Sequence, residues 1–147
     1  MYSVFLSLHN LLRWFVLASM LYAILSSVHG LLSRRPYTKQ DNVMRIMANT
    51  FGHTQLLIGF ALYFSLSPIT SYFLENGASG SEQISFFGIQ HAVTMFLAVV
   101  AMTVGGALAK RAKTDRSKFR YVLTWFLIAL TMIIFAMPWF RPWFRGF

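Results

Sequence analysis

The sequence predicts an all-α integral membrane protein, a four-helix bundle formed by a single domain over residues 1–147. Hydrophobic residues make up 56% of the chain and charged residues only 12%, with a mean hydropathy of +0.56. That charged fraction is about half the value typical of soluble domains. Four apolar segments are each long enough to cross roughly 30 Å of hydrocarbon as a helix. The expected spans cover about residues 8–32, 43–67, 84–109 and 120–138.

The distribution of basic residues predicts how these spans are oriented. Ten of the 13 Lys and Arg residues lie in two connections, 34–45 and 110–120, whereas the connection 67–84 has none and carries two glutamates. Cytoplasmic loops of membrane proteins are enriched in Lys and Arg, so both basic connections are expected in the cytoplasm and both termini on the non-cytoplasmic side. The net charge of +9 is explained in this way, and no nucleic-acid partner is expected. The chain has no cysteine, which excludes disulfides and thiolate metal sites.

The first two helices have recognisable boundaries. Residues 1–10 are expected to continue the first helix outward, and Gly30 is a plausible stop at its other end. The second helix is expected to begin near Asp41 or Asn42, because either side chain can cap a helix. Pro68 lies near the far end of that helix.

The second half of the chain starts with the only linker of soluble character, residues 75–82, which contains two glycines. The third span follows it. The fourth span has no titratable group except Tyr121 and is expected to pack against other helices or face lipid. The chain ends on PWFRPWFRGF, residues 138–147, whose aromatic and basic residues are typical of a membrane-interface belt.

Histidines inside the spans are the candidate functional residues, since ionisable side chains at membrane depth are costly and commonly mark a functional site. Measured from the middle of each span at the helical rise, His91 lies roughly 9 Å and His9 roughly 10–18 Å toward the non-cytoplasmic side. His53 lies roughly 5 Å toward the cytoplasm. His9 and His91 therefore match best in level, and two imidazoles on facing helices are a ligand set for haem iron.

Other pairings remain open. His53 and His91 differ by roughly 14 Å in depth, so they would share one iron only with strong tilt. His29 and His53 could hold a second haem near the cytoplasm, and His53 could instead serve a second metal or a quinone. Arg13, four residues after His9, could pair with a haem propionate or simply extend toward the membrane surface.

Glycines on the same spans are expected to admit a flat cofactor or a neighbouring helix. Gly52 and Gly59 lie one heptad apart on the second span, and Gly88 precedes His91 on the third. We therefore place Gly52 and Gly88 with the cofactor-binding residues.

Three motifs and one loop resemble a known family. The segments HNLLRW (9–14), FGHTQLLIGFALYF (51–64) and QHAVTM (90–95), with the loop KRAKTDRSKFR (110–120), resemble small bacterial four-helix membrane proteins labelled cytochrome b-like. The third family motif usually reads Glu-His-Pro, whereas this chain has Gln90, His91 and Ala92. The resemblance implies a multi-pass protein of the bacterial cytoplasmic (inner) membrane that carries haem.

Together these features predict a membrane b-type cytochrome, or a haem-bearing subunit of a respiratory assembly, that passes single electrons. The expected cofactor is haem b, held by His9 and His91, with a quinone as an optional partner. Lipid surrounds the protein, and further membrane subunits or a second copy are the expected protein partners. Two alternatives are a non-catalytic subunit or assembly factor, and a copper-handling protein that uses the histidines with some of its 8 Met residues.

Overall fold

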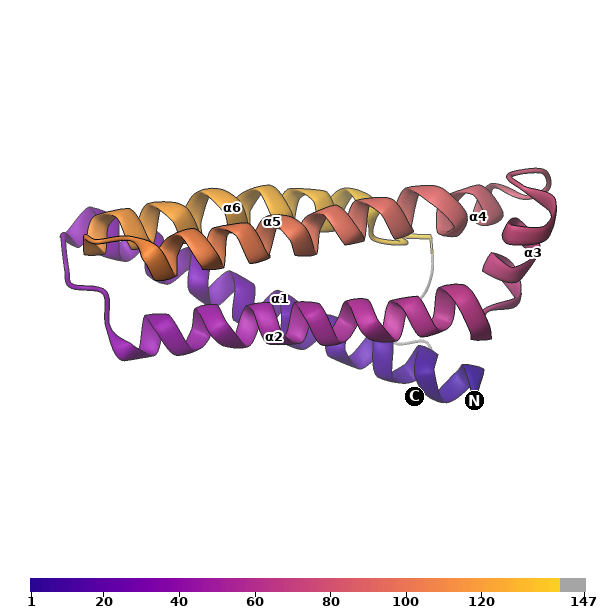
Figure 1. Ribbon diagram of the computed structural model, residues 1–147, viewed down its shortest axis with the longest axis horizontal. Coiled ribbons are helices and arrows are strands. Elements are labelled where there is room, and N and C mark those ends of the chain that lie inside the picture. The colour runs from indigo at the N-terminus through magenta and orange to yellow at the C-terminus, as the bar shows by residue number, and fades with distance from the viewer. Residues whose placement is uncertain (141–147) are drawn as a thin grey trace.

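The computed structural model describes residues 1–140, and this part of the chain is helical without any strand, which confirms the all-α part of the prediction. Four long helices lie side by side: α1 (Tyr2–Ser33), α2 (Lys39–Ala61), α5 (His91–Arg111) and α6 (Asp115–Ala136) (Figure 1). Helix α1 packs against α2 and α6, and α5 packs against α6 and α2. The connections 34–38 and 112–114 lie at one end of the molecule, here called the basic end, and the N-terminus and α3 lie at the other, the N-terminal end.

Within residues 1–140, three helical segments are long and apolar enough to cross a membrane: Tyr2–Ser33, Glu82–Arg111 and Asp115–Ala136. The segment Lys39–Leu66 passes the same test only together with Pro68–Asn76, from which it is bent by 63°. These helices are compatible with a multi-pass membrane protein.

The N-terminal end contains irregular helix that the sequence did not predict. Helix α2 continues into the π-helical turn η1 (Leu62–Leu66), and the chain then bends into α3 (Pro68–Asn76). Pro68 stands in the first turn of α3, where its missing N–H costs no hydrogen bond. On the return, α4 (Glu82–Ser85) leads through a second π-helical turn, η2 (Phe86–Gln90), into α5.

Two helix boundaries differ from those expected. Helix α2 begins earlier than predicted, because Thr38 caps it and Asp41 completes a capping box by accepting from the Thr38 backbone N–H. Helix α1 does not stop at Gly30 but runs on to Ser33. A Cβ added at Gly30 would lie 2.4 Å from the Phe119 ring, so this glycine permits close approach of α6.

Small and flexible side chains fill the centre of the helix assembly. Ala48, Ala98 and Ala129 are fully buried beside Met20 and Phe126. Close helix contact at the alanines leaves the longer side chains to fill the remaining space. At the carboxyl terminus, Trp139 and Phe140 are exposed, and the rest of the predicted interface belt, residues 141–147, lies outside the described residues.

Candidate functional site: a cavity between two imidazoles

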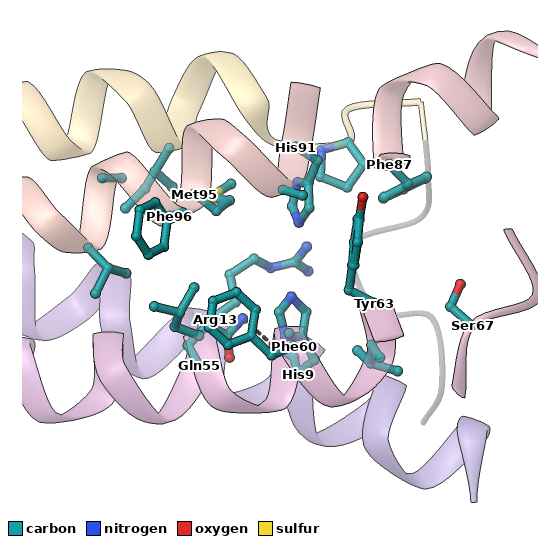
Figure 2. Close-up of a pocket in the computed structure, with 18 of the residues that line it drawn as sticks. His9, Arg13, Gln55, Phe60, Tyr63, Ser67, Phe87, His91, Met95 and Phe96 are labelled. Atoms are coloured by element: carbon teal, nitrogen blue, oxygen red, sulfur yellow. Dashed lines mark hydrogen bonds between the residues drawn. The ribbon is translucent and has the colours of Figure 1, made fainter. Parts of the chain in front are cut away.

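A cavity of about 400 Å³ lies between α1, α2 and α5 toward the N-terminal end (Figure 2). Its walls are largely apolar, and its polar side chains include two imidazoles, one guanidinium and two amides. This volume is within the range of cofactor pockets. The lining includes His9, Asn10, Arg13, Gly52, Gln55, Gly59, Phe60, Tyr63, Phe87, Gly88, His91, Met95, Phe96 and Met102.

His9 and His91 face each other across this cavity. The two ring centroids are 6.4 Å apart and the ring planes are inclined at 65°. Figure 2 shows the two side chains pointing toward one another, His9 from α1 and His91 from the start of α5. The two histidines that residue counting matched best in depth thus lie close together in space.

The His91 ring is oriented by the end of α6. Its Nδ1 lies 2.8 Å from the carbonyl oxygen of Ala136. A carbonyl only accepts, so Nδ1 carries the hydrogen and the lone pair of the neutral ring is on Nε2. The carbonyl is available because α6 ends at Ala136, and the last four carbonyls of a helix have no intrahelical N–H partner.

His9 contacts two residues of α2. Gln55 donates from Nε2 to the His9 carbonyl at 2.9 Å. A Cβ added at Gly59 would lie 3.5 Å from Cε1 of the His9 ring, so the ring packs over this glycine. Among residues 1–140, His9 Nδ1 and Gln55 Oε1 are buried without a hydrogen-bond partner. Both residues line the cavity, so a ligand there can supply these hydrogen bonds.

Arg13 adds positive charge to the cavity. Its guanidinium points into the space near the two imidazoles, and its Cζ lies 5.3 Å from the centroid of the Trp14 ring (Figure 2). No Asp or Glu is among the described residues that line the cavity. A cation in a low-dielectric site favours an anionic group.

The two π-helical turns meet beside the cavity. Tyr63 in η1 donates its hydroxyl to the carbonyl of Gly88 in η2 at 2.8 Å. The backbone N–H of His91 bonds to the carbonyl of Phe86, five residues earlier. Single π turns are frequent at functional sites, because they rotate the side chains that follow them.

Both candidate glycines, Gly52 and Gly88, line the cavity. A Cβ at Gly52 would lie 3.4 Å from Met102 Cε. A Cβ at Gly88 would lie 2.4 Å from the Phe73 ring, so Gly88 also admits α3.

The structure does not bring His53 to the other two histidines. His53 is exposed on the outside of α2 and hydrogen-bonds to Thr103 of α5, and it does not line the cavity. His29 is exposed near the basic end of α1, away from the cavity. The alternative pairing of His53 with His91 on one iron therefore does not occur.

The separation of the two imidazoles fits one metal ion between them. An imidazole nitrogen lies about 2.0–2.1 Å from a bound metal and roughly 1.2 Å from its own ring centre, which gives about 6.4 Å between the centres of two opposed rings. The rings can rotate about the metal–nitrogen axis, so the 65° inclination is compatible with this arrangement. No group of three His, Cys, Asp or Glu side chains that could hold a metal occurs in residues 1–140. A metal held by the two imidazoles would take its other ligands from a cofactor or from another residue type.

Several site residues could not be identified as such from sequence. The Ala136 carbonyl bonds to His91, and its side chain gives no indication of this role. The one sequence signal for the role of this carbonyl is Pro138, which follows the end of α6.

Comparison of the sequence with models of protein families gave no match, and neither a curated protein nor a solved structure matches it.

Proposed function

We propose that this protein is a membrane b-type cytochrome, either alone or as the haem subunit of a respiratory assembly. It would cross the bacterial cytoplasmic membrane four times, with Lys39–Leu66 and Pro68–Asn76 as the bent span and both termini on the non-cytoplasmic side. The single observation that carries the proposal is the 6.4 Å between the His9 and His91 ring centroids. This is the spacing for two imidazoles that share one iron.

The surrounding residues have distinct roles in this proposal. His9 and His91 would hold the haem, and the hydrogen bond to Ala136 fixes the tautomer of His91 and would raise its basicity as a ligand. The side chain of Arg13 would pair with a propionate. Held by two imidazoles, the group would supply single-electron exchange.

One other ligand class has a specific observation in its favour. Met95 lines the same cavity and shows its thioether sulfur there in Figure 2. Two imidazoles and one thioether are suitable ligands for Cu(I). A copper-handling protein is therefore the second candidate.

The test is a reduced-minus-oxidised spectrum of the protein purified from a bacterial membrane, with metal analysis of the same sample. We expect a b-type α-band that is lost in His9→Ala and in His91→Ala. His29→Ala and His53→Ala are matched controls, because both histidines lie outside the cavity, and they retain the band. Copper in place of haem would support the second candidate, and a colourless, metal-free protein would support a structural subunit or assembly factor.

A further inference from the structure

A second cavity, of about 500 Å³, lies at the basic end between the end of α1 and the start of α6 (Figure 1). It shares no lining residue with the cavity between the imidazoles. Its apolar lining includes Leu31 and the buried ring of Phe119, and its charged lining consists of three arginines and one aspartate. The cavity therefore combines an apolar surface with an excess of positive charge.

Two of the three arginines have no counter-ion among residues 1–140. Arg35 pairs with Asp41 at 2.7 Å, and Asp115 pairs with a lysine of its own helix at 3.2 Å. The two glutamates of the chain lie in α3 and α4, at the N-terminal end. The two arginines without a counter-ion are Arg34, which follows α1, and Arg116, in the first turn of α6. Both are exposed, so a ligand in the cavity can reach them.

The backbone at Arg34 has a conformation that favours glycine. Its φ is 54° and its ψ is 29°, and among residues 1–140 it is the only residue other than glycine with a positive φ. Helices commonly end on a glycine in this conformation, because the Cβ of other residues crowds the following carbonyl. Strained residues of this kind occur preferentially at ligand sites. The arginine side chain is thus present at a position where it costs backbone energy.

The surroundings of the cavity indicate which anion it receives. It lies where two membrane-crossing segments meet the surface, since Tyr2–Ser33 ends there and Asp115–Ala136 begins there. Leu25, Val28 and Leu32 are 59%, 37% and 80% exposed, and their spacing of three and four residues places them on one side of α1. An apolar stripe thus leads along α1 to the charged cavity. Such a surface suits a molecule with an anionic headgroup and hydrocarbon chains.

We propose that this cavity binds the headgroup of an anionic phospholipid, with Arg34 and Arg116 donating to its phosphate. Guanidinium groups form strong, charge-assisted hydrogen bonds to phosphate oxygens, and basic pockets between membrane helices bind anionic headgroups. A soluble phosphate ion would use the two arginines but not the apolar stripe on α1. This inference rests on the membrane placement of the proposed function and does not depend on haem.

The test uses full-length protein labelled with ¹⁵N in nanodiscs of phosphatidylcholine that contain increasing fractions of phosphatidylglycerol. The two lipids share a phosphodiester, but the choline group balances its charge in the first. We expect the guanidinium signals of Arg34 and Arg116 and the amide signal of Leu31 to shift and to saturate as phosphatidylglycerol is added. Inorganic phosphate added to phosphatidylcholine nanodiscs should leave these signals in place. The same shift with inorganic phosphate would assign the cavity to a soluble anion and overturn the inference.

Variants separate this cavity from the general positive charge of the basic end. With the Leu31 amide as the reporter, Arg34→Gly and Arg116→Gln should each weaken phosphatidylglycerol binding about fivefold, the effect of one arginine near anionic lipid. Arg34→Gly should not lower the Tm, because glycine adopts this backbone conformation without strain, so its weaker binding would not reflect misfolding. Arg111→Gln, which removes the same charge outside the cavity, should leave binding unchanged.

Two results would overturn the inference. Equal weakening in Arg111→Gln would show diffuse attraction to the basic end, and unchanged binding in both Arg34→Gly and Arg116→Gln would exclude the cavity. A colourless protein that still shows the saturating shift would contradict the haem but not this site. A haem-containing protein without the shift would contradict this site but not the haem.

Discussion

The carboxylate of Asp41 is predicted to be a principal stabilising group at the basic end of the molecule. Arg35 donates to both of its oxygens, at 2.7 and 2.8 Å, and Ser26 donates to one of them. The backbone and hydroxyl of Thr38 each donate at 2.8 Å. These bonds join the end of α1 to the start of α2, so the group determines how the two helices meet.

The expected cost of Asp41→Asn follows from the burial of the pair. Breaking a fully buried ion pair costs about 3–5 kcal/mol, whereas exposed pairs contribute about 0–1 kcal/mol. The Asp41 side chain is 5% exposed and that of Arg35 is 25% exposed, so solvent compensates part of the loss. In the variant, the N–H₂ group of the asparagine also faces the N–H and O–H groups that donate to the Asp41 carboxylate, and two donors cannot bond to each other. We expect a loss of about 2–3 kcal/mol, which lowers the Tm by roughly 5–10 °C.

Thermal unfolding in detergent at neutral pH measures this loss, and Asp115→Asn provides the matched control. Asp115 is also an acidic residue in a first helical turn, but it is 43% exposed and its bond to Lys118 is 3.2 Å long. Its replacement should cost less than about 0.5 kcal/mol. Equal changes in Tm for the two variants would refute the reasoning.

The same group predicts a dependence on pH. Burial alone would raise the pKa of the Asp41 carboxyl, but hydrogen bonds from Arg35, Ser26 and Thr38 outweigh it and hold the pKa well below its ordinary value. A lowered folded-state pKa gives stability that is present above the unfolded value of about 3.9 and is lost as the pH falls below it. The difference in Tm between wild type and Asp41→Asn should therefore shrink between about pH 5 and pH 2. A constant difference over that range would contradict the assignment.

Two further predictions concern packing and topology. Gly88→Ala places a Cβ 2.4 Å from the Phe73 ring, so it should destabilise the protein by about 1–3 kcal/mol in the same thermal assay, and Phe73→Leu should recover part of the loss if this contact is the cause. The chain has no cysteine, so single cysteines at Gly77 and Lys113 can be labelled with an impermeant maleimide. In intact cells Gly77→Cys should react and Lys113→Cys should react only after lysis; the reverse pattern would invert the proposed orientation.

Two of the expected spans were predictable from apolar length, whereas the boundaries of α2 and the end of α6 were not. Within residues 1–140, the expected spans 8–32 and 84–109 lie inside the observed segments Tyr2–Ser33 and Glu82–Arg111. The meeting of His9 with His91 was also predictable, since equal depth on two helices limits which side chains can face each other.

The orientation of His53 could not be predicted from the spacing of polar residues along its helix. Arg45, Asn49 and His53 repeat every four residues, yet Arg45 is buried, Asn49 is half-buried and His53 is exposed. Four residues advance a helix by about 400°, so each step rotates the position by about 40°. A stripe that begins inside the protein therefore turns outward within two steps.

Backbone features of the site were beyond sequence reasoning. The partner of His91 is a carbonyl of Ala136, and a carbonyl has no residue type by which to identify it. The π-helical turns η1 and η2 insert one residue into a helical repeat. Their positions depend on tertiary contacts such as the hydrogen bond from Tyr63 to Gly88.

The most direct test of the central claim is ligand replacement at the two imidazoles. The oxidised wild-type protein should give a low-spin ferric haem signal in electron paramagnetic resonance, and His9→Gly or His91→Gly should lose it. Added imidazole, which can enter the space left by either side chain, should restore the signal in each variant, whereas His53→Gly should be indistinguishable from wild type. An unchanged low-spin signal in His9→Gly or His91→Gly, at full haem content and without added imidazole, would contradict axial ligation by this pair.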